Sequence, residues 1–587
     1  MVAFRSENKT ERKVLKPDGL VAVLLAAWGI VNLLQAAFTG LANDEAYYWY
    51  YAQHMAWGYF DHPPMVALLV KLSQWLPGAL GIRFFSTLLQ PCYLYLLWRM
   101  VRPTEASRHE AVAFVLICFS QPLLQLYGFL ALPDAPLMMF TAVFLWAYKR
   151  FLQKETLLNA TWLGLAAALL CYSKYHGILV VALVVMSNPR LLTRWKLYWA
   201  GTVALLAFVP HLWWQYEHQW VSVNYHLVGR NAWEYKSSYT TEYLATLLVL
   251  FNPLWLWHYV QAIRRRRLKE VIPEVAFRRS LYWLLVGFLV FFLIATLRGH
   301  VQAQWLLPVV FPLVALLFAE GRKSQYVKVV GWVCVGVFMV VRVIAVANPF
   351  QLKGEIWGQE EIYRTIAQAA DGKPVQFMHN YTAAAKYTYY TGETSYCAPY
   401  FYNRQSQWQM DTSDRALAHR EVVVGDFGEF RGKEVALPNG RVFTYRLIAD
   451  YLPMRELKVS CLLPINFTLS ERDSLGRPEI VLPLAVSNPY PYDIVSTENA
   501  PIGIQMFLQP RANFAASLIA LLPNTIKANS TTVMRPRLHL DREVPDGRHV
   551  MGFAVGYTQF PPSGNNPKCQ AMVQHTASGI HIQQISK

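Results

Sequence analysis

Four ionisable residues lie close together near the start of the chain, in the segment ANDEAYYWYYAQHMAWGYFDHPP from Ala42 to Pro64. They are Asp44, Glu45, Asp61 and His62, and they follow directly after the first long apolar run. A carboxylate in such a position can take a proton from an acceptor hydroxyl or phosphate, while a nearby cation stabilises a departing lipid phosphate. A chain leaving a lipid bilayer would present this segment to water. The segment is therefore the first candidate site, and the rest of the chain has to position it.

The composition indicates a membrane protein with several spans. Hydrophobic residues make up 54% and charged residues 16% of the 587 residues, and the mean hydropathy is +0.21. The apolar residues gather in runs long enough to cross a bilayer. The formal net charge is +17, but the basic residues form short clusters at the ends of apolar runs. This is the positive-inside pattern, so we expect no nucleic-acid partner.

The fold class that we predict is a polytopic α-helical membrane protein with about 11 transmembrane helices. The first span, Leu20 to Phe38, has a basic flank from Lys9 to Lys16, which places the N-terminus in the cytoplasm. Residues 45–57 and 64–76 are too short or too polar to span, and their aromatic residues favour helices lying in the membrane interface. The run Arg264 to Arg267 is interpreted as a cytoplasmic marker, although a patch for lipid headgroups or nucleic acid is the alternative.

The odd number of spans places the remainder of the chain outside the cytoplasm. We predict a membrane domain over 1–348, an extracytoplasmic α/β domain over 349–450 with a helix from Glu360 to Ala370, and a β-rich module over 451–587. Short β-type runs such as Glu421 to Val424 and Ile480 to Leu484 support the last two. A disulfide is chemically permitted there, and the pair that we expect is Cys461 with Cys569.

Further charged residues lie at the outer ends of the predicted spans. Asp134 lies in a short turn before the fourth span, Lys174 in a break between two apolar runs, and Arg83 and Arg298 at other outer span ends. Each has a simpler interpretation, because an aspartate can cap a helix and a basic side chain can extend to the membrane surface. Three acidic turns on one side of the membrane favour a shared site. The histidines His211, His226 and His300 are interpreted as loop or interface residues.

Two runs in the first outer segment, Asp44 to Trp49 and Gly58 to Pro64, resemble the first outer loop of lipid-linked-sugar-dependent glycosyltransferases of the GT-C superfamily. The nearest branch contains bacterial aminoarabinose transferases of lipid A and protein O-mannosyltransferase-like enzymes. The likeness covers about residues 20 to 410 and continues through Gly81 to Arg83, Leu132 to Leu137, Ser173 to Tyr175, Asn252-Pro253 and Gln302 to Trp305. The β-rich module has no counterpart that we recognise.

The resemblance implies roles for individual residues. Asp44 is implied as the catalytic carboxylate, with Glu45 beside it and Asp134 as its partner in orienting a substrate. Asp61 and His62 fall on an acidic-plus-basic pair, with His62 in place of a lysine. This pair would contact the donor phosphate or a divalent metal ion, which is the one cofactor that we consider.

One departure from the family concerns the donor phosphate. The aminoarabinose transferases have an arginine a few residues after the Asp-Glu motif, where this chain has Tyr47 and Tyr48. The available substitutes are Arg83, Lys174 and Arg298, since arginine is well suited to phosphate recognition. The sugar would meet aromatic residues of the first loop, among them Tyr47 and Tyr59.

The function implied is transfer of a sugar from a polyprenyl-phosphate donor, on the outer face of a bacterial cytoplasmic membrane. The acceptor stays open between lipid, glycan and protein. The chief alternative is a transporter or lipid flippase, and a membrane anchor for the outer domain is a third possibility. The ionisable residues lie at outer span ends, away from the bilayer midplane, and no two-fold repeat is apparent, which favours the transferase.

Overall fold

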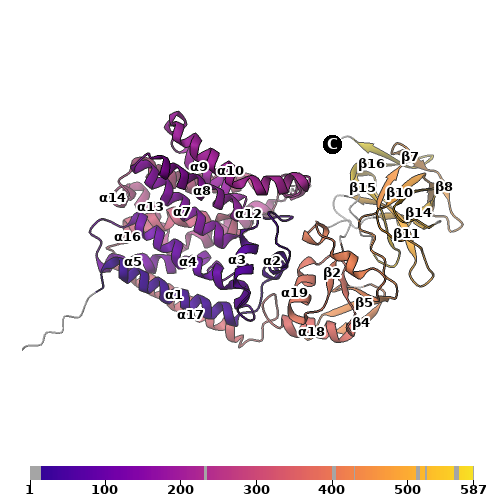
Figure 1. Ribbon diagram of the computed structural model, residues 1–587, viewed down its shortest axis with the longest axis horizontal. Coiled ribbons are helices and arrows are strands. Elements are labelled where there is room, and N and C mark those ends of the chain that lie inside the picture. Colours follow the sequence, from indigo (N-terminus) through magenta and orange to yellow (C-terminus); the bar gives the residue numbers. More distant parts are fainter. Residues whose placement is uncertain are drawn as a thin grey trace, which may run out of the picture. The chain divides into compact units, whose positions relative to one another are not determined.

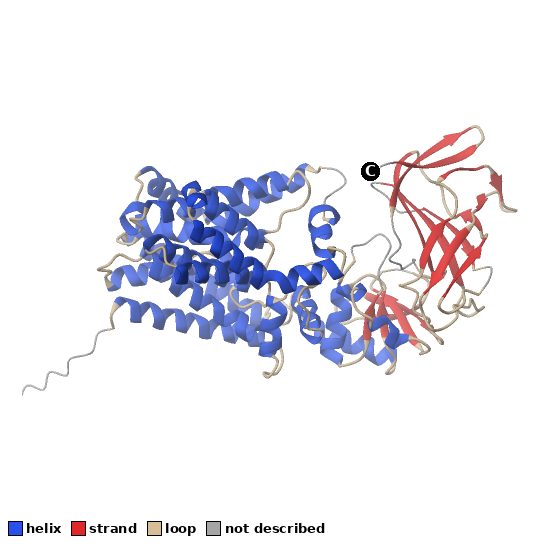
Figure 2. Cartoon of the chain, turned by 45° about the horizontal axis from the view of Figure 1, so that its top comes forward, coloured by secondary structure: helices blue, strands red, loops and turns tan. Residues whose placement is uncertain are grey.

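The computed structural model describes residues 15–230, 235–398, 405–428, 430–510, 516–522, 525–560 and 568–585, so most of the N-terminal basic flank lies outside the described residues. The chain divides into two compact units, Met1–Leu352 and Lys353–Lys587 (Figure 1). The first unit is built of helices, and the second combines helices with strands (Figure 2). The division lies close to the predicted end of the membrane domain, and the predicted α/β and β-rich parts fall within the same unit.

The long helices of the first unit follow the predicted order of apolar runs. They are α1 (Pro17–Phe38), α4 (Leu80–Val101), α5 (Arg108–Phe119), α7 (Asp134–Gln153), α8 (Leu157–Ser173), α9 (His176–Met186), α10 (Trp195–Glu217), α12 (Ser237–Phe251), α13 (Leu256–Arg264), α15 (Val275–Ala295), α16 (Val310–Gly321) and α17 (Gln325–Ala347).

Within the described chain, five helices are long and apolar enough to cross a membrane. They are α1, α10, α15, α17 and the stretch Ala303–Gly321. The pair α12 and α13, bent by 61°, would make a sixth. The helical membrane architecture is thus confirmed, and the count of 11 spans stays a prediction.

Shorter helices connect the long ones. The predicted interfacial segments are helical, as α2 (Asn43–Gln53) and α3 (Met65–Ser73). The others are α6 (Pro122–Tyr127), α11 (Val221–Asn224), α14 (Leu268–Val271), η1 (Pro189–Thr193), η2 (Tyr225–Gly229), η3 (Pro253–Trp255) and η4 (Ala303–Val309). The predicted break before α9 is present, because α8 ends at Ser173 and α9 begins at His176.

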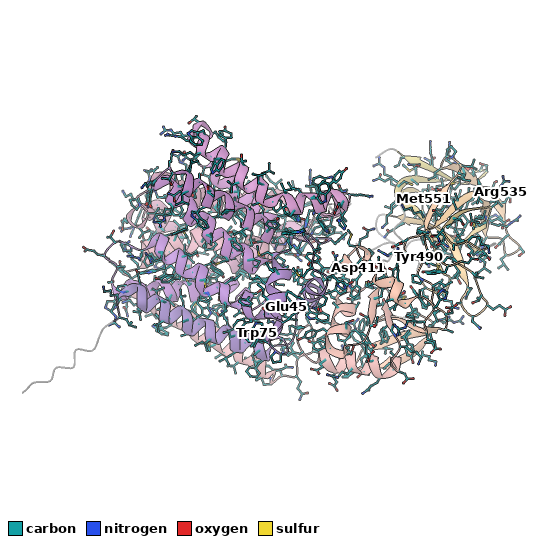
Figure 3. All side chains as sticks on the ribbon, in the orientation of Figure 1. Glu45, Trp75, Asp411, Tyr490, Arg535 and Met551 are labelled. Carbon is teal, nitrogen blue, oxygen red and sulfur yellow. The ribbon has the colours of Figure 1, made fainter. Side chains whose placement is uncertain are left out.

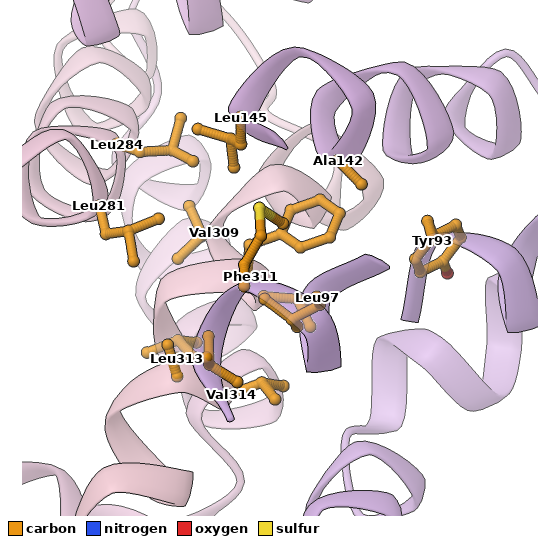
Figure 4. Packing of buried hydrophobic residues seen from close by; sticks show 14 of the residues in the cluster. Tyr93, Leu97, Ala142, Leu145, Leu281, Leu284, Val309, Phe311, Leu313 and Val314 are labelled. Atoms are coloured by element: carbon orange, nitrogen blue, oxygen red, sulfur yellow. The ribbon is translucent and has the colours of Figure 1, made fainter. Parts of the chain in front are cut away.

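The apolar core of the first unit surrounds α16. All residues of this helix except Glu320 are buried, as expected for a helix that is apolar on every face. Figure 4 shows Phe311, Leu313 and Val314 of α16 among side chains from α4, α7 and α15. Glu320 forms ion pairs with Arg265 and Arg267, at 3.2 and 3.1 Å. Two of the four consecutive arginines therefore hold helix ends together.

The first half of the second unit is a five-stranded sheet with the order β2-β1-β3-β5-β4. The strands are β1 (Val375–Phe377), β2 (Ser395–Cys397), β3 (Val422–Asp426), β4 (Lys433–Ala436) and β5 (Val442–Ile448), and the helices are α18 (Gln359–Ala370) and α19 (Tyr381–Thr391). Two short 3-10 helices, η5 (Gln407–Gln409) and η6 (Ser413–Leu417), precede β3. Strands β1, β2 and β3 are parallel. The predicted helix over 360–370 and the strand at 421–424 are confirmed.

The second half is built of antiparallel strands in two sheets. One has the order β13-β10-β6 and consists of β6 (Lys458–Cys461), β10 (Leu484–Asn488) and β13 (Ser530–Met534). The other has the order β7-β17-β16-β15-β11-β12-β14-β9-β8 and consists of β7 (Asn466–Leu469), β8 (Glu471–Arg472), β9 (Pro478–Val481), β11 (Ile502–Pro510), β12 (Ala516–Leu521), β14 (Arg537–Leu540), β15 (Gly547–Tyr557), β16 (Cys569–Thr576) and β17 (Gly579–Ile585). Its two end strands, β7 and β8, are neighbours in the sequence.

The run Ile480 to Leu484 contains the end of one strand and the start of the next, because β9 ends at Val481 and β10 begins at Leu484 in the other sheet. Pro483 lies between them and has no N–H for a strand ladder. The predicted disulfide between Cys461 and Cys569 is wrong, because both residues are free thiols.

A buried ion pair joins the two halves of the second unit. Arg455, just before β6, contacts Asp414 of η6 at 3.2 Å. Tyr490, labelled in Figure 3, donates its hydroxyl to the same carboxylate at 3.1 Å. Separating the halves would leave a buried charge unpaired, which explains why they form one compact unit.

Candidate active site

Glu45 and Arg83 form a fully buried ion pair where α2 begins; Glu45 is labelled in Figure 3. Arg83 Nε donates to Glu45 Oε1 at 2.7 Å, and Nη2 donates to Oε2. The other three N–H groups donate to the carbonyl oxygens of Ala36, Thr39 and Gly40, at 2.9, 2.7 and 2.8 Å. Arginine has five N–H donors, so none is left for a phosphate.

The carboxylate of Glu45 is equally occupied. It also accepts the backbone N–H groups of Ala42 and Ala131, at 2.9 and 2.8 Å. These bonds join the end of α1, the start of α2 and the segment before α7. The geometry therefore gives Glu45 and Arg83 a structural function, which differs from the catalytic and donor-binding roles predicted for them. Their effect on the site is to fix the backbone next to Asp44.

Asp134 and Lys174 come together although they were predicted in separate turns. The ammonium group of Lys174 donates to both carboxylate oxygens of Asp134, at 2.7 and 2.9 Å, and both side chains are buried. Asp134 is the first residue of α7, and Lys174 occupies the break between α8 and α9. Removal of either partner of such a buried pair would leave the other buried without its partner.

Tyr127 lies near both predicted catalytic aspartates and was not predicted. The negative charges of Asp134 and Asp44 both act on its phenol group. Its hydroxyl donates to Gln304 Oε1 at 3.1 Å, and this hydrogen bond connects Tyr127 with the motif from Gln302 to Trp305. Asp44, Asp134 and Tyr127 together are called the acidic group below. Sequence reasoning missed Tyr127 because it is one of 33 tyrosines and stands in no charged motif.

Lys174 and Arg230 face three histidines, His62, His176 and His226. The positive charges of both residues act on all three imidazoles. Arg230 lies over the ring of Trp305 at 4.4 Å, and in the described part of the chain no carboxylate forms an ion pair with it. Lys174 and Arg230 are called the cationic pair below. Arg230 directly follows η2 and was not among the predicted site residues.

His62 is neutral at pH 7. Burial lowers its pKa to about 3, and the nearby charge of Lys174 acts in the same direction. His62 therefore does not supply the positive charge that a lysine would supply in its place. Its Nδ1 and that of His176 are buried and have no hydrogen-bond partner among the described residues. Both atoms are available to a bound group.

The loop that carries Asp61 is held by side chains of α10, α11 and η2. The carbonyl oxygens of Trp57, Tyr59 and Asp61 lie at 2.7, 2.7 and 2.8 Å from His211 Nδ1, Ser222 Oγ and His226 Nε2, respectively. His211 was predicted as a loop or interface residue and lies within α10, where its side chain contacts this loop.

The remaining predicted residues lie in other surroundings. Tyr47 and Tyr59 are buried in an aromatic cluster, and the Tyr59 ring stacks on that of Tyr51 at 4.1 Å. Tyr51 donates its hydroxyl to Asp61 Oδ1 at 2.5 Å. Arg298 is exposed after the end of α15. No group of three or more His, Cys, Asp or Glu side chains in the described chain could hold a metal ion. Among the described residues, Asp61 and His62 are therefore not joined by a third side chain of these types that could complete a metal site.

The arrangement of helices is similar to that of two solved structures of ArnT. The chain aligns with ArnT from Cupriavidus metallidurans in the apo state with a TM-score of 0.55 and 12% identity, over 73% of this chain and 98% of that one. ArnT bound to undecaprenyl phosphate gives a TM-score of 0.52 at 12% identity, over 72% and 97%. At this identity the likeness establishes the fold.

The sequence comparisons cover a smaller part of the chain than the structural ones. Residues 61–214 match the family described as dolichyl-phosphate-mannose-protein mannosyltransferase. The lipid A galacturonosyltransferase RgtD of Rhizobium johnstonii is 28% identical over 221 residues, which are 35% of this chain and 45% of RgtD. The chain therefore spans less than half the length of this curated relative. The resemblance to GT-C membrane glycosyltransferases of the ArnT and protein-mannosyltransferase branch is confirmed.

Proposed function

We propose that this protein is a glycosyltransferase that moves a sugar from a polyprenyl-phosphate donor to an acceptor. The reaction would take place on the outer face of a bacterial cytoplasmic membrane. The observation that carries the proposal is that Asp134, one of the acidic group, forms an ion pair with Lys174 of the cationic pair. This contact connects the acidic group, which includes the proposed general base Asp44, with a site for an anionic leaving group at the ends of apolar helices. The shared fold with ArnT bound to undecaprenyl phosphate supports the choice of donor.

The reaction follows from these positions. Asp44 takes the proton of the acceptor hydroxyl, and the acceptor oxygen attacks the anomeric carbon of the sugar. The bond between that carbon and the phosphate oxygen breaks, and its electron pair leaves with the polyprenyl phosphate. Arg230 and Lys174 stabilise the phosphate charge that develops. Because the acceptor attacks opposite the leaving group, the anomeric configuration inverts.

The other polar groups assist this step. Asp134 keeps Lys174 in place, and neutral His62 and His176 offer ring nitrogens to phosphate oxygens. We propose a lipid acceptor, because the curated relative is named for lipid A. We propose that the transferred sugar is a hexose or pentose derivative.

The test compares lipid-linked and acceptor-linked sugars in membranes by mass spectrometry. Wild type, Asp44→Asn and Glu242→Gln are expressed in the same strain. Glu242 is a matched control, because it is an exposed carboxylate near the start of α12, paired with His300 at 2.8 Å. The proposal expects Asp44→Asn to lose about 100-fold or more of the transfer rate, with accumulation of the donor, while Glu242→Gln stays active.

Two outcomes would contradict this proposal. If inserted, folded Asp44→Asn transfers sugar at the wild-type rate, Asp44 is not the general base. If the wild type changes neither the donor pool nor any acceptor pool, and instead moves an unchanged solute or lipid across the membrane, the protein is a transporter.

A further inference from the structure

An arginine lies buried in α17, the last helix of the first unit. Arg342 is only 7% exposed, whereas its neighbours Val341 and Val343 are 54% and 61% exposed. The lipid-facing side of α17 is therefore apolar, and Arg342 points into the protein. A charged residue inside a spanning helix is costly and marks a functional position by default.

Arg342 has no carboxylate partner in the part of the chain that the structure describes. Its Nε and Nη2 donate to Gln125 Oε1 at 3.1 and 2.9 Å, and Nη2 also donates to the carbonyl oxygen of Gln125 at 3.1 Å. Its Nη1 is buried without a hydrogen-bond partner. An ordinary ion pair does not explain the residue, because all of its hydrogen bonds go to one glutamine.

That glutamine belongs to α6, the short helix that ends at Tyr127. Gln125 in turn donates to the carbonyl oxygen of Phe119, the last residue of α5, at 2.6 Å. Both the side chain and the backbone of Gln125 are thus fixed two residues before Tyr127. A rotation of α6 would break every bond of Arg342.

The segment after α6 is held from its other side. The guanidinium groups of Arg342 and Arg83 both lie over the ring of Phe129, at 5.7 and 5.8 Å. Two residues further on, the Ala131 N–H donates to Glu45. Gly128 lies so close to Gln90 that a side chain there would clash, with a Cβ at 2.4 Å from Oε1. The segment from Gln125 to Ala131 is therefore clamped between two buried arginines.

We propose that Arg342 is a positioning residue for the glycosyl transfer, acting through Gln125 to hold the Tyr127 phenol and the chain segment that leads from it to Asp134. The expected effect on kcat rests on the proposed function. The expected effect on the position of the Tyr127 ring is independent of that function, because it can be measured without turnover. The cationic pair comes from other elements, Lys174 before α9 and Arg230 after η2, so donor binding should be spared.

The structural test uses full-length protein with 3-fluorotyrosine at position 127, observed by fluorine NMR in detergent. Arg342→Gln and Gln125→Leu should each shift or broaden the fluorine signal. Lys328→Gln is the matched control, because it removes a positive charge from the opposite end of the same helix and should leave the signal unchanged. If Arg342→Gln folds poorly, Arg342→Lys keeps the charge, loses the two-pronged contact with Gln125 and should move the signal in the same direction.

The kinetic test measures kcat and donor KM in the same variants, per folded enzyme. Arg342→Gln and Gln125→Leu should each lower kcat by about 10-fold or more, since small displacements of catalytic groups are costly. Donor KM should stay within about twofold, and the double variant should be no slower than the slower single variant. A merely structural role would reduce the folded fraction without changing kcat per folded enzyme.

The outcomes are distinct. An unchanged fluorine signal in folded Arg342→Gln overturns the inference, as does a wild-type kcat in an enzyme with proven activity. If the variants shift the fluorine signal but the wild-type protein consumes no donor, the positioning contact is supported and the proposed function is overturned.

Discussion

Lys174 and Asp134 lie 40 positions apart in the chain, yet the ammonium nitrogen is 2.7 and 2.9 Å from the two carboxylate oxygens. Removal of one partner leaves the other charge buried and unpaired. We expect Asp134→Asn or Lys174→Met to destabilise the protein by about 3–5 kcal/mol, and the double variant to recover much of that loss. Thermal unfolding in detergent measures the stability. A double variant no more stable than either single one would contradict this, and transfer should be lost in all three.

Arg83 should not tolerate replacement by lysine. Lysine keeps the charge but has three N–H donors in place of five, so at least two buried acceptors lose their partner. We expect Arg83→Lys to lower stability by at least about 2 kcal/mol. The loss should appear as a smaller folded fraction, with near-normal kcat in the enzyme that remains. A stable Arg83→Lys protein with weakened donor binding would instead restore the role in phosphate recognition predicted from the sequence.

Arg230 and Arg298 provide a matched pair of arginines on outer segments. Arg230 stacks on Trp305 and faces the histidines, whereas Arg298 is exposed at the end of α15. Arg230→Ala should weaken binding of the polyprenyl-phosphate donor by about 10- to 100-fold, the value of a charge-assisted hydrogen bond. Arg298→Ala should bind normally. The measurement is equilibrium binding of polyprenyl phosphate to the two purified variants. Weaker binding by Arg298→Ala than by Arg230→Ala would refute the role of Arg230 in phosphate binding.

The second unit contains a pH-dependent contact at the carboxyl ends of its parallel strands. His379 follows β1, and its Nδ1 lies 3.0 Å from Asp426 Oδ2 at the end of β3. This hydrogen bond raises the pKa of His379 above its ordinary value of 6.5. Because the folded state holds the proton more tightly, the stabilisation is complete below pH 6.5 and is lost as the pH rises through the raised pKa.

Amide hydrogen exchange of β1 and β3, corrected for the intrinsic effect of pH, should therefore speed up over that interval in full-length protein. His379→Gln should remove the dependence. Equal pH dependence in both proteins would show that another group titrates.

The sequence predicted much of the architecture because periodic apolar runs report helices directly. The break before α9, the helices α2 and α3, and the strand β3 all follow from local patterns. The split between β9 and β10 depends on which sheet each half joins, which no local pattern specifies. The same limit explains the free thiols of Cys461 and Cys569.

The candidate site was predictable only in part. The Asp44 and Asp134 turns carry recognisable motifs, but the bonds of Glu45 and Arg83 form only when α1, α2 and α4 meet. Arg83 therefore looked like a free cation in the sequence. Tyr127 and Arg230 stand in no charged motif, and their importance appears only through neighbours brought close by folding.

The three hydrogen bonds to the carbonyl oxygens of Trp57, Tyr59 and Asp61 have a consequence for protein engineering. A carbonyl oxygen is the same in every residue, so the side chains that select this loop conformation belong to His211, Ser222 and His226. The first of these lies 154 positions after the residue it contacts. A chimera that receives only residues 43–64 from a relative would acquire the relative's loop side chains. It would lack the relative's residues at the positions that fix the conformation of this loop. Exchange of substrate preference between relatives should therefore require this loop and residues 211–226 to be transplanted together.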